Sequence, residues 1–123
     1  MVCATSFSAC FFDKFNFLSN KNISKISISK DSSTVMLSKE QIKEFSKKFY
    51  EIDFISNDEK NITYEFSVEI TLDRLLANKI YLYISNDFIY TSNGQRSTNQ
   101  EKYFIFFLET TFEQIKFDKT KEF

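Results

Sequence analysis

Residues 62–72 alternate strictly between apolar and polar side chains. The apolar positions are Ile62, Tyr64, Phe66, Val68, Ile70 and Leu72, and the positions between them are Thr, Ser or Glu. Successive side chains of a β-strand point to opposite faces, so this period of two predicts a long strand with one buried and one solvated face. A sheet with one solvated face is typically antiparallel, because parallel sheets are covered on both sides.

Three later segments predict further strands of the same sheet. Residues 79–84 alternate Ile and Leu with Lys and Tyr, and residues 88–91 follow them after a Ser-Asn-Asp turn. Residues 102–108, KYFIFFL, are almost continuously apolar, which is typical of a central strand covered on both faces. Asn93-Gly94 predicts a turn and residues 95–100 a polar loop. With residues 62–72, these segments predict a four-stranded antiparallel meander.

Residues 39–50 predict an amphipathic helix that is surrounded by Lys and Glu. Its apolar stripe consists of Ile42, Phe45 and Phe49. Ser38 and Gln41 have the spacing of a capping box, in which each side chain binds a free amide of the first helical turn. We expect the stripe to lie on the face of residues 62–72 that carries the even-numbered apolar side chains.

The remaining segments predict shorter elements. Residues 23–29 and 34–37 form a hairpin, and residues 52–55 form a short strand. Thr110 and Glu113 have the spacing of a second capping box, which predicts a short C-terminal helix that ends near Phe117.

These elements predict one α+β domain in two layers. Its parts are the hairpin, one main helix, the four-stranded antiparallel meander and the short C-terminal helix. The length of 123 residues fits a single domain, which we place at residues 23–117, with a frayed tail at residues 118–123 and a separate segment at residues 1–22.

The segment at residues 1–22 holds both cysteines of the chain, Cys3 and Cys10, so the chain has no disulfide framework spread through the domain. The sequence MVCATSFSAC is uncharged, and small residues precede Cys10. It resembles the end of a bacterial lipoprotein signal peptide, although Phe7 stands where Leu is usual and no basic segment comes before it. The resemblance implies that Cys10 is a lipid anchor at the cell envelope and that residues 11–22 are a tether. The alternative is an N-terminal strand with two free thiols.

A second resemblance concerns residues 23–117. The order of elements, with the segments SKEQIKEFSKKF, ISNDFIY and KYFIFFL, is similar to small exported domains of unknown function in low-GC bacteria. That family has no established chemistry to carry over to this chain.

The composition excludes several kinds of functional site. The chain has no His, which removes the commonest general base and metal ligand, and its single Gly leaves no Gly-rich phosphate loop. With 16 basic and 17 acidic residues the net charge is −1, which argues against a protein that binds nucleic acid by neutralising phosphates. Asp53, Asp58 and Glu59 lack the spacing of a calcium loop. We therefore expect no metal, no cofactor and no enzymatic activity.

The candidate site is a surface for a protein partner. Its residues are Tyr81, Tyr83, Tyr90 and Tyr103, expected on an aromatic face of the sheet, and Glu65 and Glu69, expected on the solvated face of the long strand. The two carboxylates lie about 13 Å apart along a strand, too far for a glycosidase pair. Tyrosines are common in protein contacts, but they also form ordinary cross-strand pairs.

Two functional hypotheses follow. The first is a non-enzymatic, membrane-anchored lipoprotein domain that acts as a small binding or structural module. The second is a soluble, cytoplasmic inhibitor or immunity-type protein that binds a toxin or enzyme through the tyrosines, Glu65, Glu69 and Asp87.

Overall fold

The structure, a computed structural model, describes residues 23–72 and 79–121. The lipid-anchor prediction at Cys10 and the connection at residues 73–78 lie outside the described residues. The elements are β1 (Ile23–Lys30), β2 (Ser33–Met36), α2 (Lys39–Phe49), β3 (Phe54–Ser56), β4 (Phe66–Leu72), β5 (Lys79–Ile84), β6 (Ile89–Thr91), β7 (Gln95–Ser97) and α3 (Lys102–Lys121). The predicted α+β class is confirmed.

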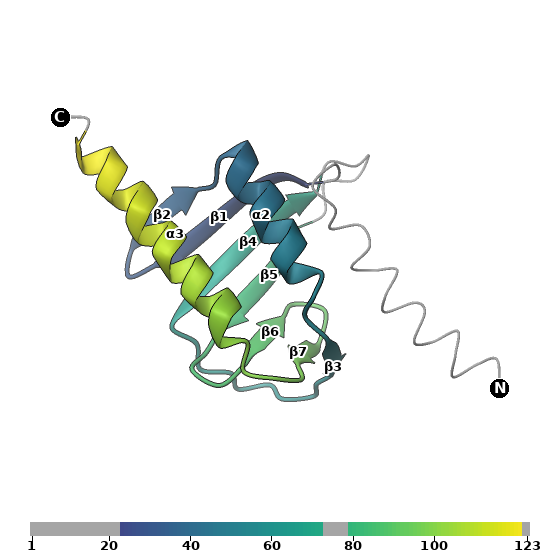
Figure 1. Cartoon of the computed structure of the whole chain (residues 1–123). Helices are drawn as coiled ribbons and strands as arrows, with labels where there is room; N and C mark the ends of the chain where they lie inside the picture. The colour runs from purple at the N-terminus through teal and green to yellow at the C-terminus, as the bar shows by residue number, and fades with distance from the viewer. Residues whose placement is uncertain (1–22, 73–78, 122–123) are drawn as a thin grey trace.

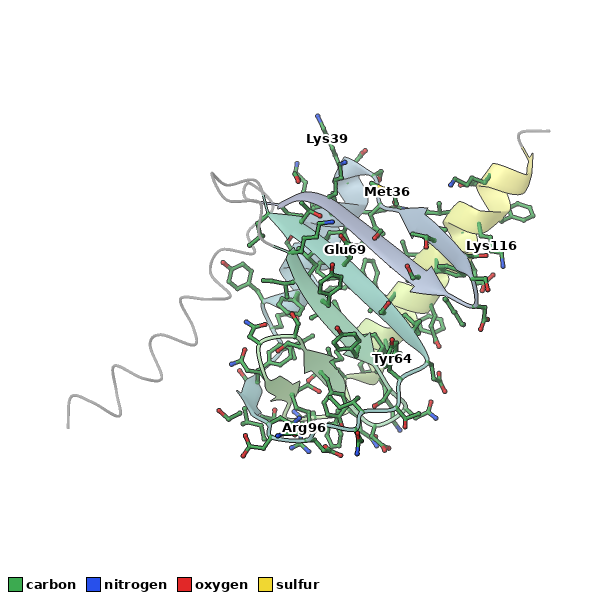
Figure 2. The ribbon with its side chains drawn as sticks, turned by 180° about the vertical axis from the view of Figure 1, so that it is seen from behind. Met36, Lys39, Tyr64, Glu69, Arg96 and Lys116 are labelled. Atoms are coloured by element: carbon green, nitrogen blue, oxygen red, sulfur yellow. The ribbon has the colours of Figure 1, made fainter. Side chains whose placement is uncertain are left out.

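The described strands form one antiparallel sheet of seven strands in the order β2-β1-β4-β5-β6-β7-β3. Strands β4 to β7 are neighbours in chain order, the hairpin β1-β2 extends the sheet beyond β4, and β3 adds the other edge. Both helices lie against the same face of the sheet (Figure 1). The view from behind shows the opposite face, over which neither α2 nor α3 lies (Figure 2). We call this second face the open face.

The core lies between the helices and the sheet. The even-numbered side chains of β4 are buried, and they belong to the same apolar cluster as the α2 stripe of Ile42, Phe45 and Phe49. The apolar stripe of α2 and the buried face of β4 therefore share one core. The strand is shorter than predicted, because its neighbour β5 ends at Ile84. The amide of Glu65 still donates to the carbonyl of Ile84 (2.8 Å), but residues 62–64 have no strand to pair with.

Local signals account for the ends of α2 and of the first hairpin. The amide of Gln41 donates to Ser38 Oγ (3.2 Å) and the amide of Ser38 donates to Gln41 Oε1 (2.8 Å), so the predicted capping box is present. Asp31 and Ser32 adopt φ of 51° and 75° in the two-residue turn between β1 and β2, as hairpins of this loop length require.

The strand predicted at residues 102–108 is wrong, because these residues form the first two turns of α3. The buried side chains Phe104, Leu108 and Phe112 recur every four residues, which is a helical spacing. The apolar residues between them hid this period in the sequence. The pair Thr110 and Glu113 lies inside the helix instead of capping it, and residues 118–121 continue the helix where a frayed tail was expected.

The fourth strand of the meander is β7, within the segment that was predicted to be a polar loop. Gly94 (φ 79°) turns the chain after β6, as the Asn-Gly signal indicated. Gln95 and Ser97 are buried despite their polarity. Ser97 Oγ accepts from the amide of Ile89 (3.0 Å) and donates to the carbonyl of Asn99 (2.6 Å), so its hydroxyl group is satisfied inside the sheet.

A pair of substitutions on β4 tests which face is buried. Phe66→Asp places a charge in the core and should remove cooperative folding, since its cost approaches the whole stability of a small domain, about 5–15 kcal/mol. Ser67→Asp places the same charge on the open face and should change the free energy of unfolding by less than about 1 kcal/mol. Urea denaturation followed by circular dichroism measures both. A stable Phe66→Asp variant, or an unfolded Ser67→Asp variant, would contradict the assignment of faces.

Candidate functional site

One row of cross-strand partners runs across the open face through all seven strands. The row is Ile55, Arg96, Tyr90, Tyr83, Ser67, Ser29 and Thr34. On β1, β2 and β4 it consists of small hydroxyl side chains, and Ser29 Oγ lies 2.9 Å from Thr34 Oγ1. On β5, β6 and β7 it consists of two tyrosines and an arginine. We call the part of the open face on β1, β2 and β4 the hydroxyl half, and the part on β5, β6 and β7 the aromatic half.

Three of the four predicted tyrosines lie together in the aromatic half. Tyr83 and Tyr90 are directly opposite each other on β5 and β6, and Tyr81 lies two residues before Tyr83 on the same face. Tyr64, which the alternation placed on the buried face, packs against Tyr83 with 5.0 Å between ring centroids and is 48% exposed. Because β4 begins at Phe66, the alternation of side chains along the strand does not determine the side on which Tyr64 lies.

Tyr103 is not part of this surface. It lies on α3, in the helical layer, and is 93% exposed. Its prediction on the sheet failed together with the strand at residues 102–108.

The predicted carboxylates flank the aromatic half in different ways. Glu69 is the cross-strand partner of Tyr81, and its carboxylate forms an ion pair with Lys79 (2.7 Å). The hydrogen bond to Glu69, together with its negative charge, raises the pKa of Lys79. Glu65 is exposed just before β4. Tyr64, Glu69 and Arg96 are labelled on the open face in Figure 2.

The far end of the aromatic half combines an arginine, an aromatic ring and an acid. The guanidinium carbon of Arg96 lies 4.1 Å from the centroid of the Phe88 ring, which is a cation–π contact. The hydroxyl group of Tyr90 donates to Glu59 Oε1 at 3.5 Å, a long hydrogen bond. Burial, followed by the negative charge of Glu59, raises the pKa of Tyr90. The sequence did not indicate that Phe88 and Glu59 belong to this surface. Strands β3, β6 and β7 have only three residues each, too few for an alternating pattern that would show how they pair.

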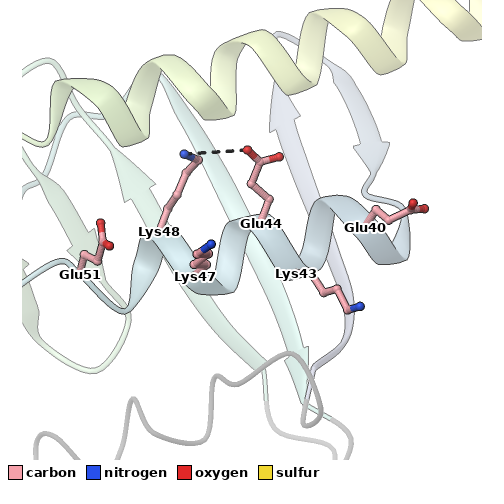
Figure 3. Close-up of a pocket in the computed structure, with 6 residues that line it drawn as sticks. All are labelled: Glu40, Lys43, Glu44, Lys47, Lys48 and Glu51. Carbon is pink, nitrogen blue, oxygen red and sulfur yellow. Dashed lines mark ion pairs between the residues drawn. The ribbon is translucent and has the colours of Figure 1, made fainter.

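The described hollows lie on the helical side of the molecule. The depression on α2 has a volume of about 500 Å³ and is lined by Glu40, Lys43, Glu44, Lys47, Lys48 and Glu51 (Figure 3). Within it, Glu44 and Lys48 extend toward α3 and form an ion pair of 3.9 Å one helical turn apart. Alternating acids and bases on an exposed helical face are typical of a solvated surface and offer no convergent polar site for a small molecule.

Within residues 23–72 and 79–121, no group of three acidic or cysteine side chains gathers closely enough to hold a metal ion. Over the same part of the chain, no helix combines the length and apolar character that crossing a bilayer requires.

Searches against protein-family models, curated proteins and solved structures return no match to this chain.

The buried tyrosine gives a dependence on pH. Since the folded state raises the pKa of Tyr90, its contribution to stability is complete below the ordinary value of 10.0 and is lost as the pH rises through the higher folded value. The free energy of unfolding should therefore fall more steeply above about pH 10 in the wild type than in Tyr90→Phe. Denaturant unfolding at a series of pH values measures this difference. Tyr90→Phe keeps the ion pair of Glu69 with Lys79, which also weakens at alkaline pH, so this pair affects both proteins equally. Parallel plots of unfolding free energy against pH for the two proteins would refute the role of Tyr90.

Proposed function

We propose that this protein is a non-enzymatic binding module of the cell envelope, anchored to the membrane by a lipid on Cys10. Residues 11–22 serve as its tether, and the aromatic half of the open face binds a protein partner. The anchor is supported by the uncharged MVCATSFSAC segment with small residues before the cysteine. The binding surface is supported by the position of the tyrosines on the face that the helices leave uncovered.

The observation that carries the binding proposal is the composition of the aromatic half. Tyr and Arg are enriched at the centres of protein interfaces, where they combine large apolar areas with hydrogen-bonding ends. Tyr64, Tyr83 and Arg96 supply such groups, and the ion pair of Glu69 with Lys79 lies beside them. A sheet face suits another protein better than a small ligand, because small ligands need a concave site.

A second candidate function is a soluble inhibitor or immunity-type protein. It is favoured by the carboxylates near the tyrosines, which outnumber the basic groups Arg96 and Lys79. The charges of Glu59 and Asp87 reach Tyr90 along with that of Arg96, Glu69 pairs with Lys79, and Glu65 is exposed before β4. Such a surface would attract a basic partner and increase its rate of association.

Intact mass spectrometry of the protein from its own cells separates the two candidates. The anchor proposal expects a chain that begins at Cys10 and carries acyl groups, which lipase treatment removes. Cys10→Ser should abolish the lipidated form, and Cys3→Ser, the matched control, should not change the mature mass. A mass that begins at Met1, with free thiols, would contradict the anchor and support the soluble inhibitor.

Substitutions on the two halves of the open face test the binding surface. Once crosslinking has identified a partner, Tyr83→Ala should weaken its binding by about thirtyfold, as expected for an interface hot spot. The matched control is Thr34→Ala at the hydroxyl end of the same row, which should leave affinity within about twofold. Isothermal titration calorimetry gives both values. Equal affinities for the wild type and Tyr83→Ala, with both proteins folded, would refute the aromatic half as the site.

A further inference from the structure

Helix α3 has apolar side chains on two opposite sides. The inner side, which includes Phe104, Leu108 and Phe112, belongs to the core. About half a turn around the helix lies a second row of side chains at spacings of three and four residues. This row, called the outer stripe below, consists of Tyr103, Phe106, Thr110, Glu113 and Phe117. Phe106 is 67% exposed and Phe117 is 58% exposed.

The outer stripe has the spacing of the a and d positions of a coiled coil, with Tyr103, Thr110 and Phe117 at a, and Phe106 and Glu113 at d. Its central part forms a shallow groove of about 420 Å³, to which Phe106 and Phe117 contribute the apolar ends. The exposed aromatic side chains Tyr103, Phe106 and Phe117 lie on one side of α3, with the polar Thr110 and Glu113 between them. Exposed aromatic side chains that share one face of a helix are typical of a contact surface.

We infer that the outer stripe pairs with the outer stripe of a second copy of this chain, with the two α3 helices antiparallel. In an antiparallel pair, a positions pack against d positions of the other helix. Phe106 then packs against Phe117 of the second copy, and Thr110 lies opposite Glu113. The two-fold symmetry forms each of these contacts twice.

The charges beside the stripe favour this arrangement. In the antiparallel register, Glu109 lies opposite Lys116 of the second copy at the flanking g positions, so opposite charges meet twice. Thr110 can also donate a hydrogen bond to the carboxylate of Glu113. A parallel pair in register would place the two Glu113 side chains in the same layer, whereas the antiparallel pair places them in adjacent layers, each beside a threonine. The parallel pair would also not bring Glu109 opposite Lys116. Lys116 Nζ lies 5.7 Å from the centroid of the Phe112 ring in the single chain, and it is exposed enough to turn toward a partner.

Sedimentation equilibrium of the full chain tests this pairing, in reducing buffer so that Cys3 and Cys10 form no intermolecular disulfide. The wild type should shift from the mass of one chain to twice that mass over about a hundredfold rise in concentration. Phe106→Glu should remain at the mass of one chain throughout. Its thermal unfolding curve should match that of the wild type at the low concentration where the wild type is also a single chain. Tyr64→Glu, an equally bulky exposed change on the open face, should associate like the wild type. A wild type that stays at the mass of one chain, or a Phe106→Glu variant that still associates, would overturn the proposal.

Charge reversal tests the antiparallel register separately. Glu109→Lys and Lys116→Glu should each weaken association at least tenfold, because each places like charges opposite each other at two positions. The double variant, which restores opposite charges, should recover association to within about threefold of the wild type. Failure of the double variant to recover would overturn the antiparallel register.

Discussion

The contact between the two helices determines which surfaces this protein presents. Phe45 and Phe49 of α2 lie 5.3 and 6.0 Å from the ring of Phe104 at the start of α3, so three aromatic rings join the helices above the sheet. Their burial, each worth about 2–3 kcal/mol, draws both helices to the same face of the sheet. Since both described helices lie on that face, the odd-numbered side chains of β4 and β5 lie on the open face, which neither of them covers.

Much of this arrangement could be predicted from patterns that are local in the sequence. The alternation in β4, the capping box of Ser38 and Gln41, and the Asn-Gly turn each depend on a few neighbouring residues, and each is present. The strand predicted at residues 102–108 failed because α3 is apolar on both its inner and outer sides, which removes the contrast that reveals a helical period. The extra side chains at Tyr103 and Phe106 are those of the outer stripe, so the feature that misled the prediction is the one that the proposed pairing explains.

The candidate site was predicted in part for a related reason. Tyr81 and Tyr83 lie on the open face because the parity of β5 is regular. Their neighbours Arg96 and Glu59 come from segments whose position depends on tertiary pairing between very short strands, which no local pattern encodes. The two proposed contact surfaces lie on opposite sides of the molecule, since the open face is turned away from α3 (Figures 1 and 2). Pairing through the outer stripe therefore leaves the aromatic half accessible to a different partner.

Binding through the aromatic half requires that a partner covers this surface where the protein works. Hydroxyl-radical footprinting, read by mass spectrometry, compares the purified protein with the protein in its own cells. Tyr64 and Tyr83 should be oxidised readily in the purified protein and be protected several-fold in the cells. Tyr50, which is 46% exposed at the end of α2, should react equally in both. Equal oxidation of Tyr64 and Tyr83 in the two preparations would show that no partner covers the aromatic half.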